Sequence, residues 1–214
     1  MNAAGERELL ASRTLGPTGK HAAMLLPTLV ELLAEIGATP SDISEVYISA
    51  GPGSFTGLRV GITVARTLGQ LLPDAKLIAV PTPLAVAETV IDEPWDHLGV
   101  LLAAKETTVH ATLIGRDDNN HPALLGEPQL APIADLVAAW PNETALAGEG
   151  LTYGDATGEH KTVGASPWYP TVEAVFAVGA RLAAAGTSTD FNHLLPVYAR
   201  RPEAVRLWEA RHGT

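Results

Sequence analysis

Residues 48–69, with the sequence ISAGPGSFTGLRVGITVARTLG, contain the residue types of a phosphate-binding loop. A short apolar run leads into a glycine-rich turn, and a helical pattern follows the turn. Backbone N–H groups at the start of a helix, together with the helix dipole, attract anions. The turn residues Gly51, Gly53, Ser54 and Thr56 are therefore candidates for binding the phosphates of a nucleotide.

Three nucleotide-binding patterns fail in or after this turn. A Walker A loop needs Gly-x4-Gly-Lys-Ser/Thr, but Gly51 and Gly57 are six positions apart and Leu58 follows. A Rossmann loop needs a third glycine where Thr56 is found, and residues 81–83, Pro-Thr-Pro, replace the acidic residue expected after the next strand. The lysine strand and catalytic aspartate of a kinase are not recognisable either. Anion binding at the helix N-terminus is the nucleotide-like alternative that stays open.

The glycines continue beyond the turn into a predicted helix, residues 56–72. Small residues recur there at every fourth position, so one ridge of the helix has almost no side chains. A glycine inside a helix costs about 1 kcal/mol relative to alanine, and this cost needs a compensating contact. Close approach of another helix or of a sheet would supply it, since i±4 ridges interlock in helix pairs. The expected partner interface comprises Gly57, Arg59, Gly61, Ala65 and Gly69, with Leu25 and Leu29 of the preceding helix.

An enzymatic alternative depends on polar side chains near the turn. Ser54, Thr56 and Arg59, with Asp42 and Glu45, could form the site of a peptidase, a hydrolase or a small-molecule kinase. Simpler roles fit better, because Ser54 and Thr56 suit helix N-caps and Asp42 suits a turn. We therefore predict no catalytic residue.

Neither a metal nor another cofactor is expected. The seven histidines show no i, i+3 or i+4 pairing, and the chain has no cysteine. A metal site needs three or four converging ligands, which this spacing does not favour. An NADP-type binding domain is a third alternative for the function, although the Rossmann pattern is incomplete.

The formal net charge of −10 argues against strong direct binding of nucleic acid. The C-terminal tail is the exception, and we predict a solvated helix there. A docking element for an acidic partner or for an RNA-bound complex is the alternative. The charged residues of the tail are Arg200, Arg201, Arg206 and Arg211, with Glu203 and Glu209.

The length of the apolar runs and the start of the chain indicate the compartment. No apolar run reaches the roughly 18 residues that a membrane-spanning helix requires. Residues 1–10 lack the basic start and apolar core of a signal peptide. We expect a cytoplasmic protein without membrane contact.

Hydrophobic periodicity predicts alternating helices and strands before a boundary near residue 95. The predicted strands are residues 6–15, 45–50 and 75–80, and the predicted helices are residues 20–37, 56–72 and 81–91. Beyond the boundary, residues 98–115 indicate two strands with a tight turn at 105–107, and residues 170–186 indicate a helix. The predicted fold is α/β with two small subdomains, residues 1–94 and 95–214.

Residues 51–69 closely resemble the signature of the TsaB (YeaZ) family. Residues 20–57 resemble the helix, turn and strand that lead into this signature. The end of the chain resembles the family's C-terminal pattern Pro-x-Tyr-x-Arg-x-x-Glu-Ala through Pro196, Tyr198, Arg200, Glu203 and Ala204. The resemblance is strong over about residues 6–92, weaker in the middle and clear again at the end.

This resemblance implies an actin-like, ribonuclease-H-like fold. It also implies a role in forming threonylcarbamoyladenosine next to the anticodon of tRNA. Members of the family are regarded as non-catalytic platforms that pair with a catalytic TsaD subunit through helices of the N-terminal subdomain. A TsaE ATPase joins them, and self-pairing through the same surface is the alternative. We expect tRNA to be bound only indirectly.

The sequence departs from the family pattern in two places and from its catalytic paralogue in a third. The metal-binding His-x-x-x-His of the catalytic paralogue is replaced here by His21 and Leu25. Ala103-Ala104-Lys105 replaces the family's Asp-Ala-Arg. The chain starts near the family's third strand, so we expect either a misassigned start or a first subdomain that lacks its N-terminal strands. A peptidase-like or ATP-binding enzyme of the same actin-like fold is the remaining alternative.

Overall fold

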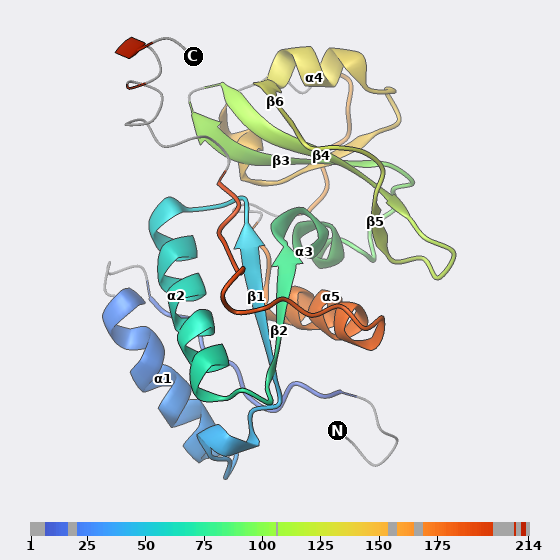
Figure 1. The fold of residues 1–214 in the computed structure, drawn as a ribbon. Helices are drawn as coiled ribbons and strands as arrows, with labels where there is room; N and C mark the ends of the chain where they lie inside the picture. Colours follow the sequence, from blue (N-terminus) through green and yellow to red (C-terminus); the bar gives the residue numbers. More distant parts are fainter. Residues whose placement is uncertain are drawn as a thin grey trace.

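The computed structural model describes residues 7–16, 21–105, 107–153, 158–164, 169–198, 208 and 211–212. These residues form two sheets, the smaller one in the lower half of Figure 1 and the larger one in the upper half. None of the helices in the described ranges is long and apolar enough to cross a membrane.

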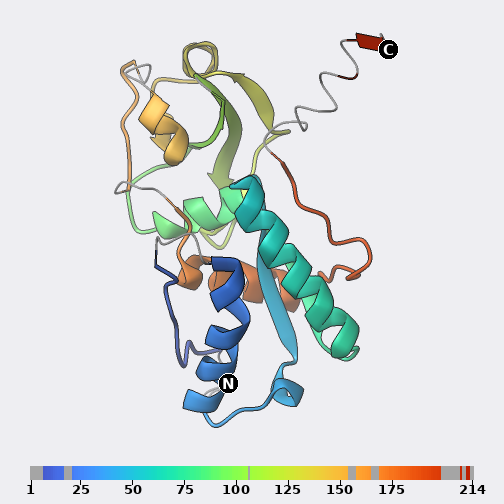
Figure 2. The same ribbon diagram turned by 90° about the vertical axis from the view of Figure 1, so that its left-hand side faces the viewer.

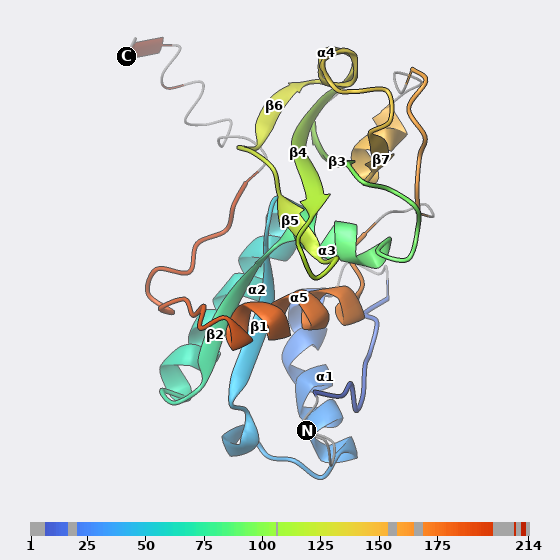
Figure 3. The same ribbon diagram turned by 90° about the vertical axis from the view of Figure 1, so that its right-hand side faces the viewer.

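The smaller sheet has two parallel strands, β1 (Glu45–Gly51) and β2 (Lys76–Pro81). Helix α2 (Phe55–Leu71) connects them, and α1 (His21–Glu35) lies beside α2. Helices α3 (Thr82–Thr89) and α5 (Val172–Ala184) pack on the other face of the sheet, as Figure 3 shows. The predicted order of helix, strand, helix, strand and helix over residues 20–91 is confirmed.

Strand alternation divides the side chains of β2 between two cores. Leu77 faces α2, where it packs with Ile62 and Ala65. Ile78 and Val80 face the opposite way, against α3 and α5. Both faces of β2 are therefore buried, as a strand between two helical layers requires.

The larger sheet has the order β5-β4-β3-β7, and β6 also pairs with β4. Strands β3 (Leu98–Lys105) and β4 (Thr108–Arg116) form the predicted antiparallel hairpin. The remaining elements of this half are β5 (Pro122–Leu124), β6 (Gln129–Pro132), α4 (Ile133–Ala139), β7 (Ala145–Ala147) and the 3₁₀ turn η2 (Glu149–Tyr153).

One face of the larger sheet packs against α4, and the other packs against α3. Val100 and Leu102 of β3 contact the α3 side through Val86 and Ala87. Helix α3 therefore lies between the two sheets and contributes to the cores of both. Helix α5 is distant from the first sheet in sequence but packs on it. The division near residue 95 stays a prediction.

The predicted strand at residues 6–15 is wrong over its described part. Residues 7–16 form no strand pairing, and Leu9 and Leu10 are exposed. Arg7 pairs with Glu45 at 3.0 Å, and Arg13 pairs with Glu35, so side chains hold this segment. A strand needs an adjacent backbone with which to exchange hydrogen bonds, and none of the described strands pairs with this segment.

Candidate functional site

The glycine turn is packed against the chain's own C-terminal part. Gly51 has a φ of +109°, and a Cβ atom there would overlap the carbonyl group of Val197. The backbone N–H of Val197 donates to the carbonyl oxygen of Ala50 at 2.7 Å. Glycine is therefore required at position 51 both by its φ and by a close backbone contact. Packing within the chain explains the residue type without any nucleotide.

The hydroxyl groups of the turn have different roles. Ser54 is the N-cap of α2, and its Oγ accepts a hydrogen bond from the backbone N–H of Gly57 at 3.4 Å. Thr56 lies inside the first turn of α2, so the prediction that it also caps the helix is wrong. Gly53 is half-buried beside Leu58. The capping role of Ser54 accounts for this hydroxyl without a nucleophile.

Residues 187–198, called here the C-terminal strap, contain a turn at 191–193 but no helix or strand, and they run beside α2 (Figures 1 and 2). Its Thr189 N–H donates to the carbonyl oxygen of Leu77 at 2.7 Å. Leu194, with 1% of its surface exposed, is buried against Ile62 and Ala65. The strap therefore adds an apolar anchor to the core between α2 and β2.

The C-terminal half of the small-residue ridge of α2 lies under the strap, and Gly61 faces the sheet. Gly61 is half-buried, and a Cβ atom there would lie 3.1 Å from Cδ1 of Ile48 on β1. Ala65 is 2% exposed, and a Cβ atom on Gly69 would lie 2.8 Å from Cβ of Phe191 in the strap. The sheet and the strap are thus the close neighbours that compensate for the internal glycines.

The partner-interface prediction is affected differently at each position of the ridge. Ala65 and Gly69 are covered by other parts of this chain, so neither residue is available to a partner's helix in this structure. Gly57 and Arg59, nearer the start of α2, are exposed. An interface on this helix stays a prediction, and it now depends on the exposed positions.

Helix α1 carries much exposed apolar surface. Leu25 and Leu29 are half-buried, and none of the side chains described for residues 22–35 is fully buried. Of the elements described, α1 makes its main contact with α2. A second row of apolar residues on α1 faces solvent, and we call it the outer α1 stripe. The outer α1 stripe comprises Ala23, Leu26, Pro27, Val30 and Ala34.

An aromatic cluster brings the two signature segments together at the start of α2. The rings of Phe55 and Tyr198 are 5.0 Å apart between centroids, with an interplanar angle of 35°. The guanidinium carbon of Arg59 lies 5.3 Å from the centroid of the Phe55 ring. Sequence reasoning named Arg59 and Tyr198 separately and missed Phe55. The sequence hinted at this contact only because residues 51–69 and the C-terminal pattern with Tyr198 resemble parts of the same family.

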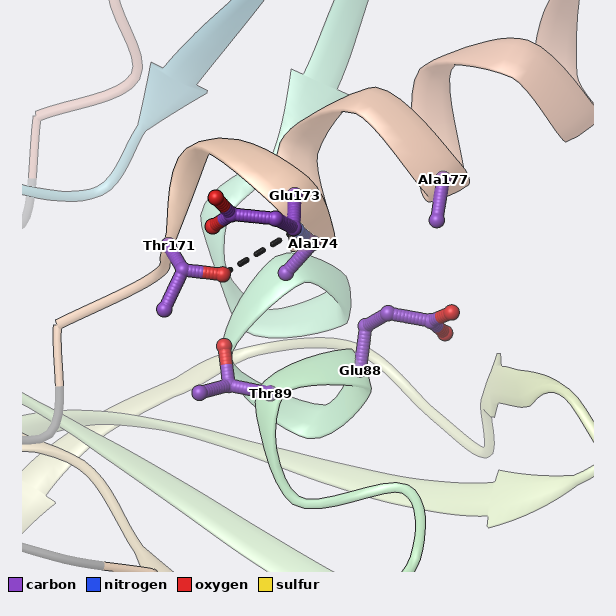
Figure 4. A pocket seen from close by; sticks show the side chains of 6 residues that line it. All are labelled: Glu88, Thr89, Thr171, Glu173, Ala174 and Ala177. Atoms are coloured by element: carbon purple, nitrogen blue, oxygen red, sulfur yellow. Dashed lines mark hydrogen bonds between the residues drawn. The ribbon is translucent and has the colours of Figure 1, made fainter. Parts of the chain in front are cut away.

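A hollow of about 340 Å³ lies between α3 and α5 (Figure 4). Its carboxylates do not converge, because Glu88 and Glu173 point in opposite directions. Glu88 is paired with Arg181 through contacts of 2.9 and 2.6 Å. Thr171 accepts a hydrogen bond from the backbone N–H of Ala174 and so caps α5. Glu88 and Thr171, which line this hollow, therefore have structural partners.

Two acidic residues of the enzymatic alternative are also in structural roles. Asp42 accepts hydrogen bonds from the hydroxyl and the backbone N–H of Thr39, which hold the pKa of its carboxyl below the ordinary value. Partial burial raises the pKa of Glu45, but hydrogen bonds from Tyr47 and Arg7 outweigh it and leave the pKa lowered. Burial and the nearby Glu45 raise the pKa of Tyr47 to about 12.

The remaining titratable groups show no metal-binding arrangement within the described ranges. No three histidine, aspartate or glutamate side chains there are close enough to hold an ion. Burial raises the pKa of Glu149, whose carboxylate accepts a hydrogen bond from the backbone N–H of Ala103. Burial lowers the pKa of His110 on β4. Most of the C-terminal tail, including Arg200, lies outside the described residues.

Comparison with known proteins gives one family over most of the chain. The family model described as TsaD, tRNA N6-adenosine threonylcarbamoyltransferase, matches residues 16–193. The tRNA threonylcarbamoyladenosine biosynthesis protein TsaB of Escherichia coli is 27% identical over 205 residues, covering 85% of this chain and 81% of that protein. TsaB of Bacillus subtilis is 40% identical over 52 residues, or 24% of this chain and 23% of that protein.

A solved structure agrees with the sequence matches. A Pseudomonas aeruginosa protein described as similar to the peptidase YeaZ superimposes with a TM-score of 0.74 at 25% identity, covering 84% of each chain. The structural similarity and the family match together confirm the predicted α/β, actin-like fold.

Proposed function

Because the chain belongs to the TsaD family and is one of its TsaB (YeaZ) members, we propose that it is a non-catalytic subunit for threonylcarbamoyladenosine formation on tRNA. In this proposal a TsaD-like subunit catalyses the transfer next to the anticodon, in a cytoplasmic complex that a TsaE-like ATPase joins. Pairing of two copies of this chain through the same helices is the alternative assembly.

The observation that carries this proposal is the outer α1 stripe. Leu26 and Val30 are 51% and 63% exposed, although they lie at the centre of an apolar helix face. Contiguous apolar surface of this kind is typical of protein interaction sites. Gly57, which is exposed at the start of α2, extends the candidate interface.

The packing of the glycine turn supports a non-catalytic role. The Val197 carbonyl packs against Gly51, and Ser54 caps α2 by accepting a hydrogen bond from the backbone N–H of Gly57. The family's Asp-Ala-Arg is replaced by Ala103-Ala104-Lys105, so an acidic group is missing from the end of β3. These residues offer structural contacts in place of acid–base chemistry.

The test is co-purification of this chain with a TsaD-like subunit. Val30→Glu and Leu26→Glu should weaken pairing at least about tenfold, because an interface that buries an unpaired carboxylate loses more than 1.4 kcal/mol. Leu124→Glu on β5 is the matched control, since this leucine is equally exposed but lies on the other sheet. Pairing at the wild-type level in both α1 variants would refute the proposed interface.

A further inference from the structure

The aromatic cluster of Phe55, Arg59 and Tyr198 remains partly exposed to solvent despite the contacts among its three side chains. Phe55 keeps 50% of its surface exposed even though Tyr198 packs beside it. Arg59 is exposed, with its guanidinium group near the Phe55 ring. The cluster therefore presents aromatic and cationic surface together at one end of α2.

The stretch of sequence that contains Phe55 and Arg59 carries only positive charge. Residues 50–73 contain Arg59 and Arg66 but no aspartate or glutamate. No ion pair joins Arg59 to a carboxylate of the described residues. This contrasts with the chain as a whole, whose formal net charge is −10.

The sequence after Tyr198 extends the positive charge. Residues 191–202 contain no aspartate or glutamate, and Arg200 and Arg201 follow Tyr198 directly after one alanine. In the structure, Tyr198 is at the end of the C-terminal strap, beside Phe55. The cluster thus lies where the acidic body of the molecule meets the start of its basic tail.

We propose that the aromatic cluster contacts RNA, with an unpaired base stacking on Phe55 or Tyr198 and a phosphate meeting Arg59. Bases stack on aromatic rings and on guanidinium planes wherever a loop leaves them unpaired. An arginine without a carboxylate partner is free to meet a phosphate. The identity of the RNA as the tRNA of the modifying complex rests on the proposed function.

Stacking surface beside a cation favours RNA over an apolar protein partner. An apolar protein partner would be matched by an apolar surface such as the outer α1 stripe, which lacks arginine. The aromatic cluster instead combines stacking surface with cations that have no acidic neighbour in residues 50–73. The contact adds to RNA binding by other subunits, since the overall acidic charge opposes strong binding by this chain alone.

Two measurements on the full chain test this contact. An in vitro transcribed tRNA is crosslinked by ultraviolet light to the chain alone, and the adducts are mapped by mass spectrometry. Adducts are expected at Phe55 or Tyr198. Fluorescence anisotropy then gives the affinity of the same tRNA for the chain paired with a TsaD-like subunit.

Phe55→Ala and Arg59→Ala should each weaken this affinity about fivefold or more, as expected for the loss of one stacked base or one phosphate contact. Arg59→Ala should also make the salt dependence of binding shallower. Arg66→Ala is the matched control, because Arg66 lies on the same helix but does not stack on an aromatic ring of the described residues, and its effect should stay below about twofold. Co-purification of each variant with the TsaD-like subunit is measured in parallel.

The outcomes separate this inference from the proposed function. Weaker tRNA binding with unchanged subunit pairing supports the RNA contact. Loss of pairing in the Phe55 and Arg59 variants would assign the cluster to a protein interface and overturn it, as would unchanged tRNA affinity in both. Crosslinks at the cluster in a wild-type chain that fails to pair would refute the proposed function while supporting the RNA contact.

Discussion

We expect the C-terminal strap to be an integral part of the fold, and Leu194→Ala tests this directly. Leu194 is 1% exposed and packs in one cluster with Ile62, Ala65 and Leu77. Truncating a buried leucine to alanine costs about 2–5 kcal/mol, through lost burial and the cavity that remains. A loss of this size is a large fraction of the roughly 5–15 kcal/mol by which domains are stable.

Leu195→Ala is the matched control, because the next residue has the same side chain but is 65% exposed. Its effect should stay within about 0.5 kcal/mol. The free energy of unfolding of both variants is measured by urea denaturation monitored by circular dichroism. The slope m is compared between the variants to detect a change in the cooperativity of unfolding. Equal stability of the two variants would show that the strap is not packed on α2 and β2 as described.

Three further predictions concern the ridge, the helix cap and the ion pair. Ala65→Glu should prevent stable folding, because it places an unpaired carboxylate at a position that is 2% exposed; a wild-type melting temperature would contradict the buried ridge. Ser54→Ala should lower the free energy of unfolding by about 1 kcal/mol through loss of the cap on α2, and an unchanged urea midpoint would contradict that role. Glu45 has a lowered pKa in the folded state, so its contribution to stability is present above its ordinary pKa of 4.5 and is lost as the pH falls through the folded-state value. Urea midpoints between pH 3 and 6 should therefore fall less steeply on acidification in Glu45→Gln than in the wild type, and parallel profiles would exclude this contribution.

Local patterns in the sequence were sufficient to predict most of the elements. The periodicity of residues 56–72 predicted α2, and the hairpin β3–β4 follows from two apolar runs around a tight turn. Helix ends were also predictable, since Gly37 and Gly186 have positive φ values at the ends of α1 and α5. These features depend on neighbours within a few residues, which the sequence places together.

A strand cannot be predicted from its own residues alone when its pairing partner decides whether it forms. Residues 7–16 have a strand-like pattern, but they are held by Arg7 and Arg13 through ion pairs and exchange no backbone hydrogen bonds with a described strand. A strand needs both a suitable residue pattern and a neighbouring strand to pair with. The sequence shows the pattern, but the tertiary structure decides whether a neighbouring strand is present.

The small-residue ridge of α2 shows what the sequence could predict about a contact and what it could not. The spacing of Gly61, Ala65 and Gly69 determined that something must approach this helix closely, because internal glycines need compensation. Only the tertiary structure decided what approaches. Ile48 comes from the adjacent strand, whereas Phe191 comes from the distant C-terminal strap, and contacts between distant segments leave no periodic trace in either one.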